Sequence, residues 1–343
     1  MGCLKFRRKR IVPTLPDSQA SPFPRRMSNS GPAAGAQITH PRKYGLNQVY
    51  PDPSISAQSE EPSIDIIAVH GQGTGSPEAW VARRIDGDPN SGDVHWLKDK
   101  DMLPSKVPNS RIFTYDWDAS LGPDMAIDSM LGHADLLLAI LDIKTEPAKR
   151  PIIWVASGFG GLLVAKALQR ASEGNSRYHD ILHSTIGAVF LGTPFRGSEN
   201  SLYSAADLRL AIALSTGAEF GGELVGYCRG LDDIVPRFTQ MVSHDGFKFP
   251  IVCFYETQKT CVGTLVRNKS DIPEGFRLTL EGNWAVLVGR YSASLQGIEA
   301  LPLDVRHDML SKFTHCEDPS FKSVANRIKG FADNAGNMLA AKR

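Results

Sequence analysis

Apolar residues gather into short runs separated by longer amphipathic stretches from about residue 63 onward. The first run, Ile64–Val69, stops abruptly at His70-Gly71-Gln72-Gly73, which is typical of a buried strand that enters a glycine turn. Further strands are predicted over Arg111–Tyr115, Pro151–Ala156, Ile186–Leu191, Phe249–Tyr255 and Trp284–Val288. Apolar residues at helical spacing predict helices over Ala126–Ile143, Gly160–Ser172, Ser204–Leu214 and Pro319–Phe331.

Strands that alternate with helices predict an α/β fold, with a mostly parallel sheet covered by helices on both faces. In such a sheet, functional residues collect in the loops that follow the carboxyl ends of the strands. We assign residues 63–331 to this domain and residues 332–343 to a C-terminal tail. The length of 343 residues suits one large domain with tails.

Residues 1–62 show no apolar periodicity and are rich in Pro, Ser, Gly and Ala, which predicts a disordered basic tail. Gly2 and Cys3 are followed by a basic cluster, as in a two-signal membrane anchor. The motif is incomplete, because Phe6 occupies the position where acylation favours Ser or Thr. A nuclear-import signal, a mitochondrial address and a plain solvated tail remain alternatives.

Overall charge and cysteine content narrow the functional classes. Lys and Arg total 38 against 37 for Asp and Glu, so the balance gives no general reason to expect nucleic acid. Five scattered cysteines without a C-x-x-C pair argue against a disulfide framework and a zinc site, and fit a cytoplasmic protein. The apolar run at Ala134–Ile143 is too short to span a bilayer. We expect no metal and no cofactor.

The segment 152–168 predicts a strand, a tight turn and a helix, which is the context of a nucleophile elbow. The residues two before and two after the apex must be small, because the strand and the helix nearly touch there. With the apex at Gly158, these residues are Ala156 and Gly160. With the apex at Ser157, they would be a valine and a phenylalanine. The pattern therefore places the apex at Gly158, which has no hydroxyl.

This elbow resembles the G-H-S-L-G-G-L-V-V-K-x-A-L segment of fungal lipase-like hydrolases, which are related to serine active site-containing esterases. Such domains often form the N-terminal modules of NOD-like receptors. Further matches are His70-Gly71 (H-G), Trp96-Leu97 (W-L), Leu103-Pro104 (L-P), the stretch from Gly192 to Ser198 (G-T-P-H-R-G-S), Phe254-Tyr255-Glu256-Thr257 (F-Y-E-T), and His307 with Met309, Lys312 and Phe313 (H-S-D-M-x-K-F). The chain departs from the pattern at the elbow and at Phe195, where the family has His.

The resemblance implies an α/β-hydrolase fold, with position 158, Glu256 and His307 in the order of nucleophile, acid and base. In an active member, the histidine takes the serine proton and the carboxylate orients the imidazole. Backbone N–H groups of Gln72 and Phe159 would bind the oxyanion. We interpret His70 as a structural residue that hydrogen-bonds the turn after the first strand.

Two hypotheses follow from these residues. The first is a pseudohydrolase, a binding or signalling module for a lipid or ester small molecule or for a protein partner. The second is a working serine hydrolase on lipid or other carboxylic esters, which uses Ser157 or a histidine-activated water with Glu256 and His307. Dinucleotide binding is not expected, because neither glycine turn completes G-x-G-x-x-G.

Overall fold

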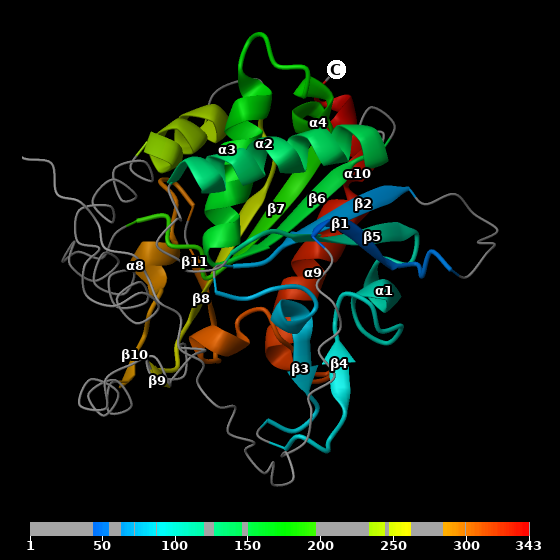
Figure 1. Cartoon of the computed structure of the whole chain (residues 1–343), viewed down its shortest axis with the longest axis vertical. Helices are drawn as coiled ribbons and strands as arrows, with labels where there is room; N and C mark the ends of the chain where they lie inside the picture. Colours follow the sequence, from blue (N-terminus) through cyan, green and yellow to red (C-terminus); the bar gives the residue numbers. More distant parts are fainter. Residues whose placement is uncertain are drawn as a thin grey trace, which may run out of the picture. The chain divides into compact units, whose positions relative to one another are not determined.

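A seven-stranded sheet with the order β1-β5-β2-β6-β7-β8-β11 is the centre of the fold (Figure 1). The computed structural model describes residues 44–54, 63–71, 73–86, 88–119, 127–145, 150–196, 233–243, 247–261, 284–298 and 300–342. The strands of the sheet are β1 (Gly45–Tyr50), β2 (Ile64–Val69), β5 (Ser110–Asp116), β6 (Ile152–Ser157), β7 (Thr185–Leu191), β8 (Ile251–Glu256) and β11 (Ala300–Leu303). All neighbouring pairs are parallel except β1 with β5, which are antiparallel.

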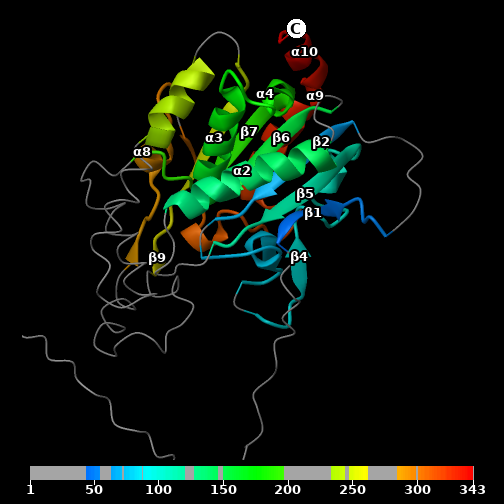
Figure 2. The same cartoon turned by 45° about the horizontal axis from the view of Figure 1, so that its top comes forward.

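Helices cover both faces of this sheet (Figures 1 and 2). One face carries α2 (Ile127–Lys144), α3 (Phe159–Ser172) and α4 (His179–Ser184), and the other carries α1 (Leu103–Lys106) and α9 (Pro319–Asp333). The other described helices are η1 (Glu78–Trp80), α8 (Arg290–Ala293), η4 (His307–Met309) and α10 (Ala335–Ala340), and residues 233–243 are also helical. Two small hairpins complete the described elements: β3 (Val81–Arg83) with β4 (Asp93–His95), and β9 (Thr260–Cys261) with β10 (Trp284–Ala285).

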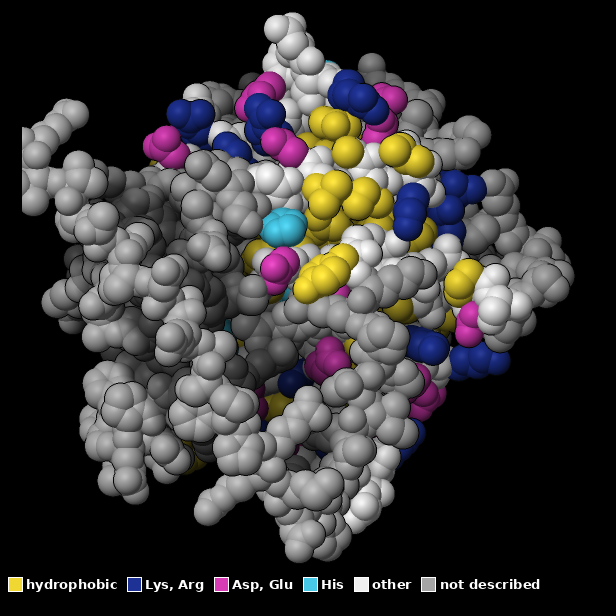
Figure 3. All heavy atoms as spheres, viewed as in Figure 1, with side chains coloured by type: hydrophobic (Ala, Val, Ile, Leu, Met, Phe, Trp, Pro, Cys, Tyr) yellow, Lys and Arg dark blue, Asp and Glu magenta, His cyan; other side chains and the backbone are white. Residues whose placement is uncertain are grey.

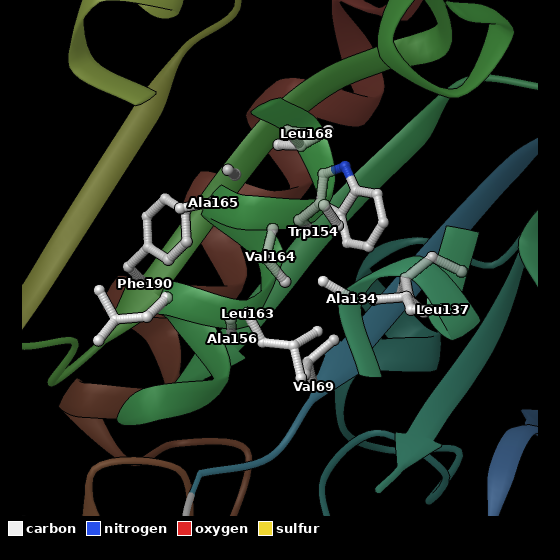
Figure 4. Packing of buried hydrophobic residues seen from close by; sticks show 14 of the residues in the cluster. Val69, Ala134, Leu137, Trp154, Ala156, Leu163, Val164, Ala165, Leu168 and Phe190 are labelled. Carbon is white, nitrogen blue, oxygen red and sulfur yellow. The ribbon is translucent and has the colours of Figure 1, made fainter. Parts of the chain in front are cut away.

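The middle strands are buried on both faces, which explains their nearly continuous apolar sequence. In β6, Trp154 and Ala156 pack against the α2 and α3 side, as Figure 4 shows. Ile153 and Val155 point to the opposite side and pack in the cluster that contains α9. The sheet thus separates two hydrophobic cores.

The predicted fold class, a mostly parallel sheet with helices on both faces, is confirmed. The strand predicted at Ile64–Val69 has the observed bounds, and four others correspond to β5, β6, β7 and β8. The run at Trp284–Val288 was wrong as a strand of the sheet, since only Trp284–Ala285 is extended and it pairs with β9. The helix predicted over Ser204–Leu214 lies outside the described residues.

The predicted tail boundaries were also wrong. β1 lies inside the range 1–62 and pairs with β5 at the edge of the sheet, where Leu46 is its only buried residue. A strand with so little burial has no apolar run to reveal it. At the other end, α9 and α10 extend the fold through residues 332–340, and Lys342 donates hydrogen bonds to two backbone carbonyls near the start of β7. Residues 1–43, for which we predicted disorder, lie outside the described residues.

A buried ion pair joins β2 to β5. Asp65 and Arg111 are register partners in the sheet. The guanidinium donates one hydrogen bond to each carboxylate oxygen, from Nε to Oδ1 and from Nη2 to Oδ2, both 2.7 Å long. Arg111 Nη2 also donates to the carbonyl of Thr145, just after α2. Burial raises the pKa of Asp65, and the neighbouring guanidinium lowers it by less. Arg111 is therefore the main compensating cation of this carboxylate, and Arg150 adds a weaker attraction.

We expect Arg111→Met to lower the free energy of unfolding by about 3 to 5 kcal/mol, because it leaves a buried carboxylate without its cation. The double variant Asp65→Leu/Arg111→Met should recover most of that loss, since no charge then stays buried. Urea unfolding at pH 7 measures both changes.

The exposed pair Arg83–Asp93 supplies a matched control, with side chains 46% and 55% exposed. Arg83→Met should cost less than about 1 kcal/mol. Equal costs for Arg83→Met and Arg111→Met would contradict the role of burial.

Candidate active site

The turn between β6 and α3 has the strained geometry of a nucleophile elbow. β6 ends at Ser157, α3 begins at Phe159, and Gly158 between them has φ 51° and ψ −130°. Side chains rarely tolerate this conformation, and glycine adopts it readily. The Gly158 N–H donates to the carbonyl of Leu191 at 2.9 Å, which fixes the turn against the end of β7. Gly158 thus occupies the apex that the sequence pattern indicates.

The packing around this turn explains which neighbours must be small. A Cβ on Gly160 would lie 2.4 Å from the carbonyl oxygen of His70 and 2.6 Å from that of Val69. A Cβ on Gly71 would lie 3.1 Å from the carbonyl oxygen of Ser157. Among the described residues beyond its chain neighbours, a Cβ on Gly158 would meet only the Cα of Gly71, at 3.7 Å. Position 158 therefore has room for a side chain, whereas positions 160 and 71 do not.

Ser157 is the last residue of β6 and pairs with Leu191 of β7. Alternation along the strand gives its side chain the same face as Ile153 and Val155, which is the α9 side of the sheet. The turn residue Gly158 comes one position later. The hydroxyl of Ser157 therefore does not occupy the apex position.

Glu256 and His307 lie together at the carboxyl ends of β8 and β11. The distance from Glu256 Oε1 to His307 Nδ1 is 3.4 Å, with the carboxylate fully buried and the imidazole 25% exposed. Oε1 also accepts hydrogen bonds from the backbone N–H groups of Leu287, at 2.7 Å, and Val288, at 2.6 Å. Two backbone donors thus fix this carboxylate oxygen, with His307 Nδ1 beside it, so the carboxylate is placed to orient the imidazole.

The same imidazole lies beside the elbow. Gly192 directly follows β7, and a Cβ on it would be 3.6 Å from His307 Cε1. Its neighbour Leu191 provides the carbonyl that binds the Gly158 N–H. The backbone of His307 is fixed by a 2.8 Å hydrogen bond from its N–H to Thr260 Oγ1. The fold therefore brings together the turn, the carboxylate and the imidazole that the sequence pattern singled out.

Of the two oxyanion donors predicted, Phe159 stands at the first position of α3, where backbone N–H groups point out of the helix. Gln72 lies outside the described residues. Among the residues that the structure describes, no three His, Cys, Asp or Glu side chains are grouped so that they could hold a metal ion.

His70 anchors the loop that follows β2, in agreement with its structural interpretation. The residue is fully buried, and its Nδ1 is 2.8 Å from the carbonyl oxygen of Gly71. Its Nε2 is 2.8 Å from Asp116 Oδ1, and its ring stacks on Trp117. The Trp117 indole also donates to the carbonyl of His70 at 2.9 Å. Sequence analysis missed Asp116 and Trp117, although their position at the carboxyl end of a parallel strand, β5, was a signal that could have found them.

Phe195 stands where the resembled family has a histidine. Its ring is buried, packs edge-on against Phe190 with centroids 4.9 Å apart, and stacks on Phe238. A histidine there would bring a polar ring into this aromatic contact. The departure at Phe195 therefore makes this side of the site more apolar.

Three glycine-to-alanine variants separate crowding from backbone strain. Gly160→Ala should lower the free energy of unfolding by about 3 kcal/mol, because its Cβ meets rigid backbone oxygens. Gly158→Ala should cost about 1 to 2 kcal/mol, since only the positive φ opposes it.

Gly174, where a Cβ would meet nothing within 4 Å, is the matched control. Gly174→Ala should change stability by less than about 0.5 kcal/mol. Thermal unfolding orders the three variants, and a Gly160→Ala protein as stable as Gly174→Ala would contradict the crowding at the elbow.

Comparison with known proteins finds curated relatives that match this chain over only part of their length. No family model matches the chain. Protein SERAC1 from Bos taurus is 25% identical over 244 residues, which cover 67% of this chain and 35% of the relative. Protein SERAC1 from Mus musculus is 27% identical over 173 residues, which cover 49% of this chain and 25% of the relative. The chain thus spans about a third or less of the length of these curated relatives.

Solved structures similar to this chain include a lipase and an esterase. The lipase BlEst2 from Bacillus licheniformis has a TM-score of 0.44 and 18% identity, over 83% of this chain and 97% of that one. Esterase B from Lactobacillus rhamnosis has a TM-score of 0.45 and 12% identity, over 88% and 90%. The sheet order, the elbow after β6 and the carboxylate after β8 give this chain an α/β-hydrolase fold.

Proposed function

We propose that this chain is a pseudohydrolase, an α/β-hydrolase of esterase or lipase type whose site binds a ligand without hydrolysing it. The observation that carries the proposal is Gly158 at the apex of the elbow. Acyl transfer by this fold requires a nucleophilic side chain at that turn. Glycine keeps the backbone geometry and offers no atom to attack a carbonyl.

The groups around the apex support ligand binding. Glu256 lies beside Nδ1 of His307, and in its imidazolium form His307 can donate a hydrogen bond from Nε2 to a carbonyl or carboxylate oxygen. The first N–H of α3, at Phe159, can do the same at the positive end of the helix dipole. The ligand we infer is a lipid or another small molecule with an ester or acyl group. A protein partner that responds to the bound ligand would make the domain a signalling module.

The link to fungal receptor modules remains a proposal. No helix in the described part of the chain combines the length and the apolar character needed to cross a membrane. We keep cytoplasmic residence, with attachment through acylated Gly2 and Cys3, as part of the proposal.

The competing function is an active serine hydrolase that uses Ser157. For this, the Ser157 hydroxyl would have to reach His307 and the oxyanion donors from a position one residue before the turn. The strand alternation that sends its side chain to the α9 face argues against such a path. The room at Gly158 instead supports a simple reconstruction of the site, because a Cβ there would lie no closer than 3.7 Å to described atoms beyond its chain neighbours.

We expect no labelling of the parent protein by a fluorophosphonate probe and clear labelling of Gly158→Ser. The introduced hydroxyl would lie at the apex, where His307 can act as its base. In Gly158→Ser/His307→Ala, the labelling rate should fall by roughly 100-fold or more, the usual contribution of a general base. Gel fluorescence with mass spectrometry of the labelled peptide gives the rate and the site.

Ser157→Ala serves as the discriminating control. Labelling of the parent that disappears in Ser157→Ala would overturn the pseudohydrolase proposal and identify Ser157 as the nucleophile. Thermal unfolding of each variant confirms that it is folded before labelling is compared.

A further inference from the structure

Two buried hydrogen bonds hold the segment that carries His307 against the β3–β4 hairpin, and both involve Ser311. The Ser311 hydroxyl donates to the carbonyl of Ala79, in η1 just before β3, at 2.8 Å. The indole N–H of Trp96, directly after β4, donates to the carbonyl of Ser311 at 2.9 Å. Ser311 is 8% exposed and Trp96 is fully buried. The two bonds join residues that are 232 and 215 positions apart in the chain.

Ser311 follows His307 by four residues, and a tight helical turn connects them. The turn begins in η4, and the backbone N–H groups of Met309, Leu310 and Lys312 each donate to the carbonyl three residues earlier. These bonds leave the backbone between the two residues little freedom. A constraint on Ser311 therefore also restricts the position of His307.

The donor on the hairpin side is held by aromatic packing. The ring of Trp96 makes edge contacts with Phe313, at a centroid distance of 5.0 Å, with Trp80, at 6.2 Å, and with Phe321, at 6.4 Å. Packing from several sides fixes the plane of an indole and thus the direction of its N–H. The W-L match at Trp96-Leu97 therefore includes a rigid donor aimed at the His307 segment.

An ion pair makes a third connection between this segment and the hairpin. Arg306 Nη1 lies 3.0 Å from Asp86 Oδ2, in the connection between β3 and β4, and Arg306 Nε lies 3.2 Å from Asp308 Oδ1. The side chains of Arg306 and Asp86 are 35% and 57% exposed, so solvent weakens their attraction. On the face that Figure 3 shows, basic and acidic side chains also lie beside one another at the surface. The buried bonds of Ser311 therefore restrict the segment more than this ion pair does.

We propose that Ser311 is a positioning residue of the site, which acts through His307 by joining its helical turn to the β3–β4 hairpin. Glu256 lies beside Nδ1 of the imidazole, Thr260 accepts the backbone N–H of His307, and Ser311 fixes the other end of the turn. Together these contacts set the direction of Nε2 before a ligand arrives, which lowers the cost of binding. The ligand contact of the imidazole rests on the proposed function, whereas the connection through Ser311 does not.

The first test compares fluorophosphonate labelling rates in two backgrounds. In Gly158→Ser, the further change Ser311→Ala should slow labelling by roughly tenfold, because a general base that is slightly displaced loses part of its contribution. In Gly158→Ser/His307→Ala, Ser311→Ala should change the rate by less than about twofold, because Ser311 acts only through the imidazole. An equal effect in both backgrounds would overturn the proposal.

Two further variants in the Gly158→Ser background make this test specific. Trp96→Phe keeps an aromatic ring against Phe313 and removes the indole donor, so it should slow labelling by a factor similar to that of Ser311→Ala. Ser110→Ala is the matched control, because its buried hydroxyl donates to the carbonyl of Val107 at 2.7 Å and lies at the start of β5, at the opposite edge of the sheet. It should leave the rate within about twofold. A loss as large as that of Ser311→Ala would contradict the specific role.

The second test uses the chain with Gly158 and does not depend on the proposed function. Diethyl pyrocarbonate modifies neutral imidazoles, and mass spectrometry follows His307 separately from the exposed His183. Ser311→Ala should raise the rate at His307 at least about threefold and leave the rate at His183 within about 1.5-fold, because only the His307 segment is released. An unchanged rate at His307 would overturn the proposal, as would equal rises at both histidines, which would show a general loss of structure. If Gly158→Ser is not labelled by the fluorophosphonate, the proposed function fails, and this modification rate alone decides the role of Ser311.

Discussion

The contact between the first turn of α3 and the end of β2 is the constraint on which the site depends. The backbone oxygens of Val69 and His70 lie where a side chain on Gly160 would be, so the helix can approach only through glycine. This approach forces the chain to reverse within one residue, and Gly158 takes the positive φ that the reversal requires. The geometry of the elbow is thus a consequence of packing between a strand and a helix.

The rest of the site is arranged around this contact by groups that fix loops. The pair of His70 and Asp116 holds the loop after β2, whose carbonyl lies against α3. On the other side, Glu256 ties the segment at Leu287 and Val288 to the loop that carries His307. Buried charged and polar groups therefore position backbone and imidazole at the carboxyl edge of the sheet, where a parallel sheet gathers its functional residues.

The parts of this arrangement that sequence analysis could predict are those with a local signal. β2 and the elbow have apolar runs that end in glycine turns, and burial on both faces makes such runs long. β1 and β11 were missed because these edge strands are only partly buried, and β11 has four residues that include Pro302, which weakens a local strand pattern. Pairing of residues far apart in the chain, such as His70 with Asp116, depends on strand order, which no local pattern encodes.

The glycine at the apex affects the backbone strain of the elbow. Any other residue at φ 51° is strained by roughly 1 to 2 kcal/mol, a cost that an enzyme tolerates for the sake of its nucleophile. A glycine there relieves the strain while Gly160, Gly71 and the Glu256–His307 pair keep their places. Under the proposed function, loss of a hydroxyl at this position would stabilise the fold and leave Glu256 and His307 in place.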